Sequence, residues 1–222
     1  GSTSGVVTGV AAGTPTISYI LNTGCYATYP ITVNTTPAGI TGTTSVCTGF
    51  TTTLADATPG GTWSSSNTAI GTVGAGTGVV GGIAAGNVTI TYTMGTGCFV
   101  TTTITVNQTP AAITGTNTVC IGLTTVLSNT LSGGLWSSSN TAQATVGSTT
   151  GIVTGVAIGT PNITYAMPTG CLVSVNITVS PAPASITGPT AVCAGSPITL
   201  SDATSGGVWS SGNSSIATVN PG

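Results

Sequence analysis

Charged side chains are almost absent from this chain. Its 222 residues include no Lys, Arg or His and only two acidic residues, Asp56 and Asp202, whereas ordinary soluble domains carry roughly a quarter charged residues. Most general acids and bases are therefore missing, and the many Ser and Thr hydroxyls have no neighbouring base to activate them. We expect no enzymatic activity, no catalytic residue and no cofactor.

The same absences restrict the partners. Nucleic acids and anionic membrane surfaces are bound mainly through Lys and Arg, which this chain lacks. Two carboxylates cannot build the multi-oxygen cage of a calcium site, and the cysteines show no CxxC spacing for zinc. No apolar run approaches the ~18 residues of a membrane-spanning helix. The sequence predicts no nucleic-acid binding, no membrane insertion and no calcium or other metal.

A repeat of 73 residues organises what is present. The positions that recur are Trp63, Trp136 and Trp209; Cys47, Cys120 and Cys193; Cys25, Cys98 and Cys171; Tyr19, Tyr92 and Tyr165; and Pro37, Pro110 and Pro183. Boundaries at these prolines define two complete repeats, 37–109 and 110–182. Residues 1–36 match the C-terminal half of a repeat and 183–222 match the N-terminal half. The predicted order is therefore circularly permuted across the chain ends.

Each repeat shows the pattern of short β-strands. Val88, Ile90 and Tyr92 alternate with threonines, which is the period of two that a half-buried strand requires. β-branched residues dominate, and clusters of Gly, Pro, Asn and Ser interrupt them at short intervals. No window has a convincing helical period. The sequence predicts an all-β fold, with a compact two-sheet sandwich in each repeat.

One stretch of the repeat resembles a known family. The segments are Gly61-Thr-Trp-Ser-Ser-Ser-Asn-Thr-Ala-Ile70, Thr72-Val73, Gly78-Val-Val, Ala84-Ala-Gly86 and Thr89-Ile-Thr91. They resemble bacterial Ig-like repeats of the group 2 type, as in secreted adhesins and surface proteins. Val46-Cys47 and Gly97-Cys98 are similar to the cysteine-bearing variant in large secreted proteins of Bacteroidota. The resemblance recurs in every repeat and implies tandem Ig-like β-sandwiches in an extracellular or cell-surface protein. It implies little about function, because such modules are mostly spacers.

Six cysteines follow the repeat. Each complete repeat carries two, and the predicted disulfides lie within repeats, Cys47 with Cys98 and Cys120 with Cys171; the alternative is buried free thiols. Disulfides would place the protein in an oxidising, extracellular setting. The half-repeats carry one cysteine each. For Cys25 and Cys193 we predict an inter-subunit disulfide, because two intervening domains would hold them too far apart within one chain.

The recurring aromatic residues have a structural and a functional interpretation. We predict that Trp63, Trp136, Trp209, Tyr19, Tyr92 and Tyr165 are core residues of the sandwiches. The alternative for the tryptophans is a set of sugar-stacking platforms. Rows of threonine such as Thr101, Thr103 and Thr105 predict the solvent face of a sheet, with an ice- or glycan-binding array as the alternative.

The half-repeats suggest how the chain functions. Half a sandwich would expose apolar faces and open strand edges, so we expect a neighbouring copy, or the continuation of a longer polypeptide, to complete it. A head-to-tail contact that does not close generates a filament. The sequence therefore predicts a structural subunit or repeat segment of an extracellular filament, whose partners are other copies of itself. The alternatives are stalk repeats of a giant cell-surface adhesin and, third, an ice- or glycan-binding array.

Overall fold

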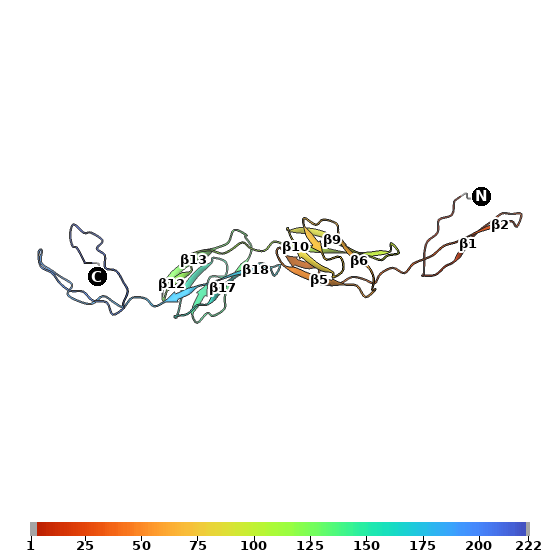
Figure 1. Ribbon diagram of the computed structural model, residues 1–222. Helices are drawn as coiled ribbons and strands as arrows, with labels where there is room; N and C mark the ends of the chain where they lie inside the picture. The colour runs from red at the N-terminus through yellow and green to blue at the C-terminus, as the bar shows by residue number, and fades with distance from the viewer. Residues whose placement is uncertain (1–3, 221–222) are drawn as a thin grey trace. The chain divides into compact units, whose positions relative to one another are not determined.

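Strands are the only regular secondary structure in residues 4–220, which are the residues that the computed structural model describes. This confirms the all-β class. The described residues form two compact units. The first extends to Thr109 and also takes in Thr169–Cys171, whereas the second comprises Pro110–Pro168 and the chain from Leu172 onward (Figure 1). Within this range, nothing helical has the length and hydropathy needed to span a bilayer.

The first unit contains a sandwich of two four-stranded sheets. Its strands are β3 (Thr41–Gly42), β4 (Ser45–Cys47), β5 (Thr51–Ala55), β6 (Thr62–Ser65), β7 (Gly71–Val73), β8 (Val79–Gly82), β9 (Gly86–Thr93) and β10 (Phe99–Asn107). One sheet has the order β4-β10-β9-β6 and the other β3-β5-β8-β7. Neighbouring strands are antiparallel except β4, which runs parallel to the last three residues of β10. The parallel pair places the end of β4 at the end of β10.

The core between these sheets is the cluster Val46, Leu54, Trp63, Val80, Val88, Ile90, Tyr92, Ile104 and Val106. Trp63 and Tyr92 are directly opposite each other on β6 and β9, with ring centroids 4.7 Å apart. The phenol of Tyr92 accepts a hydrogen bond from the Gly61 N–H (2.9 Å) and donates one to the Thr58 carbonyl (2.7 Å). Glycine is required at position 61, because a Cβ there would lie 2.5 Å from the tyrosine ring.

The second unit contains a sandwich of the same construction. Its strands are β11 (Thr114–Gly115), β12 (Thr118–Cys120), β13 (Thr124–Ser128), β14 (Leu135–Ser138), β15 (Ala144–Val146), β16 (Ile152–Gly155), β17 (Asn162–Ala166), β18 (Leu172–Asn176) and β19 (Thr178–Ser180). The sheets are β11-β13-β16-β15, β14-β17-β18 and the parallel pair β12-β19. The single strand β10 of the first unit corresponds here to two strands, β18 and β19, which are separated at Ile177. The Ile177 N–H donates to the Pro161 carbonyl. The core is Val119, Leu127, Trp136, Ala144, Val153, Ile163, Tyr165, Ile177 and Val179.

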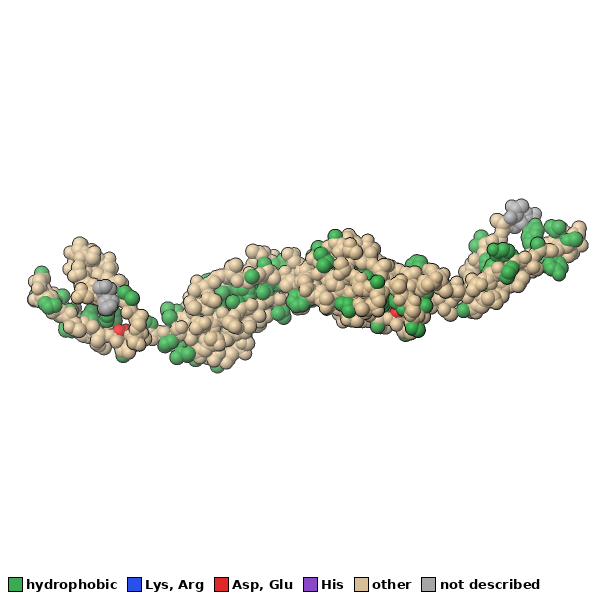
Figure 2. Space-filling view, viewed as in Figure 1, with side chains coloured by type: hydrophobic (Ala, Val, Ile, Leu, Met, Phe, Trp, Pro, Cys, Tyr) green, Lys and Arg blue, Asp and Glu red, His purple; other side chains and the backbone are tan. Residues whose placement is uncertain are grey.

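The flanking segments have no comparable core. Strands β1 (Thr16–Ile20) and β2 (Tyr26–Pro30) form an antiparallel hairpin, and residues 183–220 contain one isolated bridge, between Thr187 and Ser201. No second sheet faces this hairpin among the described residues, and apolar side chains stay on its surface (Figure 2). The prediction that Tyr19 and Trp209 are core residues does not hold here, because Tyr19 is 60% exposed and Trp209 is half-buried. Residues 1–3 and 221–222 of the predicted half-repeats lie outside the described residues.

The tyrosine hydrogen bonds give a first testable prediction. Tyr165 repeats the arrangement of Tyr92, accepting from the Gly134 N–H and donating to the Leu131 carbonyl. Tyr165→Phe removes both bonds but keeps the ring, so we expect a loss of about 1–2 kcal/mol in the free energy of unfolding. Urea denaturation followed by tryptophan fluorescence measures it. The control Tyr29→Phe changes an exposed side chain and should stay within ~0.5 kcal/mol. Equal losses in the two variants would contradict the prediction.

Candidate functional site

The candidate site is a disulfide at one end of the first sandwich, and its first half is Cys47. This residue ends β4 and pairs with Asn107, the last residue of β10. A tight turn comes next, closed by a hydrogen bond from the Phe50 N–H to the Cys47 carbonyl (3.0 Å). Gly49 occupies the turn with φ +83°, a conformation that favours glycine. The turn holds the half-buried Cys47 at the end of the sheet.

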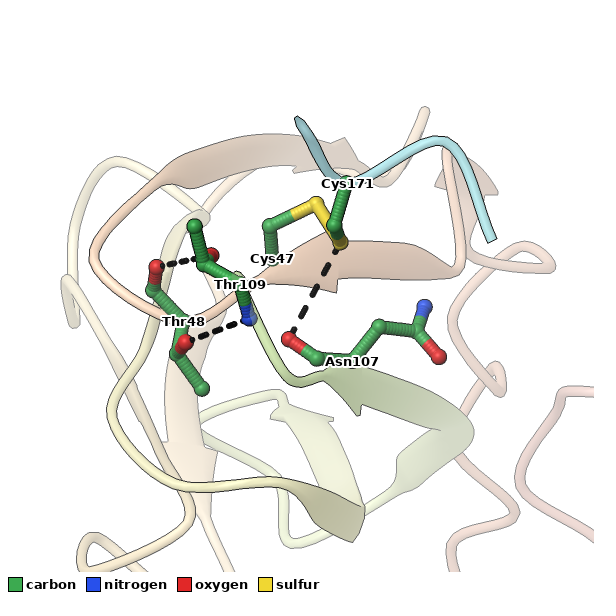
Figure 3. The surroundings of a disulfide bond; sticks show 5 residues. All are labelled: Cys47, Thr48, Asn107, Thr109 and Cys171. Atoms are coloured by element: carbon green, nitrogen blue, oxygen red, sulfur yellow. Dashed lines mark hydrogen bonds between the residues drawn. A yellow bond between two sulfur atoms is a disulfide. The ribbon is translucent and has the colours of Figure 1, made fainter. Parts of the chain in front are cut away.

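The second half of the site is Cys171, at the tip of the β17–β18 hairpin. The tip turns at Gly170 with φ +88°, again in the region that favours glycine. Cys171 bonds to Cys47 with the two Cα atoms 5.7 Å apart, within the usual range for a disulfide. Its Sγ lies 4.0 Å from the Asn107 carbonyl oxygen (Figure 3). Cys171 is only 1% exposed.

The chain leaving β10 is fixed beside this bond. Thr109 donates its N–H to the Thr48 hydroxyl (3.0 Å) and its own hydroxyl to the Thr48 carbonyl (2.6 Å) (Figure 3). These two bonds tie the residue that precedes Pro110 to the residue that comes after Cys47. The disulfide therefore lies beside the point where the chain leaves β10, and it covalently joins residues 124 positions apart.

The predicted pairings of Cys47 with Cys98 and of Cys120 with Cys171 are wrong in this structure. Cys98 immediately precedes β10, whereas Cys47 is level with the other end of that strand. Nine residues of strand at ~3.3 Å each separate them by roughly 30 Å, far beyond the ~7 Å that a disulfide can bridge. Cys120 and Cys171 are separated in the same way, because Cys120 pairs with Ser180 and Cys171 precedes Leu172.

Four cysteines are free thiols. Cys98 and Cys120 are half-buried, and Cys25 and Cys193 are exposed. Cys25 lies at the tip of the β1–β2 hairpin, the place that Cys98 and Cys171 occupy in their own hairpins. The predicted bond between Cys25 of one copy and Cys193 of another stays a prediction, since it concerns two chains.

The other predicted residues lie in structural positions. Trp63, Trp136, Tyr92 and Tyr165 are at most 8% exposed and belong to the two cores, so they offer no open platform for a sugar. Thr101, Thr103 and Thr105 are exposed on β10.

Each of the two carboxylates accepts a hydrogen bond within a local turn of the chain. Asp56 accepts from the Thr58 N–H, and Asp202 accepts from the Thr204 N–H. In the part of the chain that the structure describes, no three potential ligands of the His, Cys, Asp or Glu types come together for a metal. The disulfide junction is therefore the site around which a function can be argued.

The geometry defines an all-β protein with sandwich units and a disulfide, Cys47–Cys171, within the first unit. No protein-family model matches the chain, and no curated protein matches it. Among solved structures it is similar to the C-terminal 282-residue fragment of intimin in complex with the intimin-binding domain of the translocated intimin receptor. The identity is 15% and the TM-score 0.47, over 69% of this chain and 67% of that one.

Two further solved structures are similar to this chain. Domains 1–6 of the surface layer protein SbsC are 18% identical with a TM-score of 0.30, over 88% of this chain and 40% of that one. The EC1-4 segment of Drosophila N-cadherin is 13% identical with a TM-score of 0.28, over 78% and 59%. The chain thus spans less than two thirds of both. At these identities and scores the likeness carries no conclusion about function.

Proposed function

We propose that this chain is a structural subunit or repeat segment of an extracellular filament or surface fibre, built from bacterial group 2-type Ig-like repeats of the cysteine-bearing kind. Its incomplete sandwiches are completed by strands from another repeat-bearing segment, and disulfides join successive repeats. The absence of Lys, Arg and His fits a role that is mechanical rather than catalytic. The Cys47–Cys171 bond fits an oxidising, extracellular location.

The observation that carries the proposal is a contrast in burial between equivalent residues. Ile17 is 39% exposed, whereas Ile90 and Ile163, one and two repeats further on, are 0% exposed. Tyr19 shows the same contrast with Tyr92. The flanking segments therefore present side chains that the repeat buries wherever both of its sheets are present. Burying apolar surface is favourable by about 25 cal/mol per Å², which favours association with a missing sheet.

The two flanking segments are complementary halves of one sandwich. The β1–β2 hairpin corresponds to β9–β10 and β17–β18. In the segment 183–220 the bridge between Thr187 and Ser201 has the register of Thr114 with Ser128 in β11 and β13. Leu200 is 39% exposed there, whereas its counterparts Leu54 and Leu127 are 2% exposed. One segment thus supplies what the other lacks, and joining them between copies is a head-to-tail contact that continues without closing.

A charge placed on the inner face of the hairpin tests completion. We expect Ile17→Asp to abolish filaments in electron micrographs and large species in sedimentation velocity, because completion would bury an unpaired carboxylate. The urea stability of the two complete sandwiches should not change, since Ile17 contacts neither core.

The matched control is Thr28→Asp on the outer face of β2. Its counterparts Thr101 and Ser174 are exposed in the complete sandwiches, so the same charge there should leave assembly intact. Filaments formed by the Ile17→Asp chain, or no assembly by the unchanged chain, would sink the completion proposal.

A further inference from the structure

A shallow hollow lies at the end of the β12–β19 pair in the second unit. It measures about 320 Å³ and is lined by Thr118, Val119, Cys120, Leu123, Thr124 and Ser180. The free, half-buried thiol of Cys120 is part of its wall. This thiol has no disulfide partner among the described residues of the chain.

The corresponding place in the first unit is filled. Cys120 lies opposite Ser180 as Cys47 lies opposite Asn107, in the same parallel register. The turn after each cysteine is also the same, with Leu123 donating to the Cys120 carbonyl at 3.0 Å and a glycine φ of +82°. Against Cys47 this place holds Cys171 and its hairpin tip. The hollow beside Cys120 is therefore the same receiving surface without its hairpin tip.

The tip of the β1–β2 hairpin also turns at a glycine directly before its cysteine. Leu21 donates to the Cys25 carbonyl at 2.8 Å, and Gly24 donates back to the Leu21 carbonyl at 2.9 Å with φ +85°. The tip before Cys98 has the same two bonds, and Gly170 before Cys171 has φ +88°. Cys25 is exposed, whereas Cys171, in the docked tip, is buried. The glycine that precedes Cys25 thus has nearly the same φ as the glycine that precedes the bonded Cys171.

We propose that the hollow beside Cys120 receives the β1–β2 hairpin tip of a second copy of this chain, with Cys25 of that copy bonded to Cys120. By the same spacing, Cys193 of the first copy bonds to Cys98 of the second. The inference rests on the proposed completion of half-repeats and specifies its covalent links. It replaces the expected bond between Cys25 and Cys193, because in a completed sandwich those two lie level with opposite ends of one strand, as Cys47 and Cys98 lie level with opposite ends of β10.

Each bond forms by two thiol–disulfide exchanges with a small-molecule disulfide such as oxidised glutathione. The Cys120 thiolate attacks one sulfur of the oxidant and releases one thiol, which leaves a mixed disulfide on Cys120. The Cys25 thiolate of the second copy then attacks the Cys120 sulfur and releases the second thiol. Two protein thiols are oxidised and one disulfide of the oxidant is reduced to two thiols, so electrons and protons balance.

The linkage map is the test. The chain is assembled in a glutathione redox buffer and digested without reductant by chymotrypsin, since trypsin has no Lys or Arg to cleave. Mass spectrometry then identifies the linked peptides, and the four cysteines fall in four different ones. We expect Cys25 linked to Cys120 and Cys98 linked to Cys193. A bond between Cys25 and Cys193, or an unmodified Cys120 thiol in assembled material, overturns the inference.

Two variants separate the pairings on non-reducing gels. Cys25→Ser should keep a covalent ladder through the remaining Cys98–Cys193 bond, whereas the double variant Cys98→Ser/Cys120→Ser should lose it. The reverse pattern assigns Cys25 to Cys193 and overturns the inference. Electron microscopy of the same samples shows whether filaments form, which tests the proposed function separately. Filaments with the wrong links leave the function standing, and correct links without filaments refute the function alone.

Discussion

Pulled from both ends under oxidising conditions, residues 37–182 are expected to reach a fully extended length about sevenfold shorter than after reduction. Without the disulfide, unfolding both sandwiches releases about 145 residues, or roughly 500 Å of extended chain. With it, tension passes from Pro37 to Cys47, crosses to Cys171 and leaves at Ala182. That covalent path contains about 21 residues, or roughly 75 Å. Optical tweezers measure the difference as the gain in contour length.

Matched cysteine variants show whether the Cys47–Cys171 bond is the cause. Cys47→Ser/Cys171→Ser should release the full length without reductant, and Cys25→Ser/Cys193→Ser should behave like the unchanged chain, because both substituted thiols lie outside residues 37–182. Full release from the oxidised, unchanged chain would show that the bond does not carry the load. The expected result means that unfolding of a sandwich scarcely lengthens the disulfide-bonded chain.

Removal of a core tryptophan is the second large effect. Trp136 is 7% exposed and packs against Tyr165 at a ring-centroid distance of 4.7 Å. Trp136→Ala leaves a cavity between the sheets, and we expect a loss of about 3–5 kcal/mol in the free energy of unfolding of that sandwich. Urea denaturation monitored by circular dichroism measures it. The control Leu135→Ala, on the same strand but 56% exposed, should cost less than ~1 kcal/mol.

Trp63→Ala extends this test to the first sandwich. Trp63 packs against Tyr92 as Trp136 packs against Tyr165, so the two substitutions should lower the free energy of unfolding by about the same amount. The two cores share no residue, so the losses should add in the double variant. A loss for Leu135→Ala as large as that for Trp136→Ala would contradict the assignment of Trp136 to the core. A shift in the unfolding transitions of both sandwiches caused by either single substitution would show that the sandwiches unfold as one.

Local pattern predicts the strands of this fold well. The alternation of Val88, Ile90 and Tyr92 with threonine correctly predicts which face of β9 is buried, because a strand has a period of two regardless of its surroundings. The repeat also predicts the tryptophans of the complete repeats as core residues, and the structure places them there. Residue spacing is therefore sufficient to predict the strands and the buried face of each complete repeat.

Contacts between distant segments cannot be predicted in this way. The disulfide pairing depends on the parallel register of β4 with the end of β10, which no local pattern encodes. The expected pairing within one repeat would join cysteines that lie level with opposite ends of β10. Tyr19 and Tyr92 occupy equivalent positions but differ in burial, because burial depends on a facing sheet. A count of residues along β10 is the one available signal against the wrong pairing.

The span of the disulfide has a consequence for cleavage of the backbone by proteases. At 124 residues it is longer than one period of 73, so bonds of this type in successive repeats enclose overlapping stretches of backbone. Hydrolysis of any one peptide bond between Cys47 and Cys171 leaves both fragments attached through sulfur. A protein built in this way can be cut once by a protease and stay in one piece until a reductant arrives.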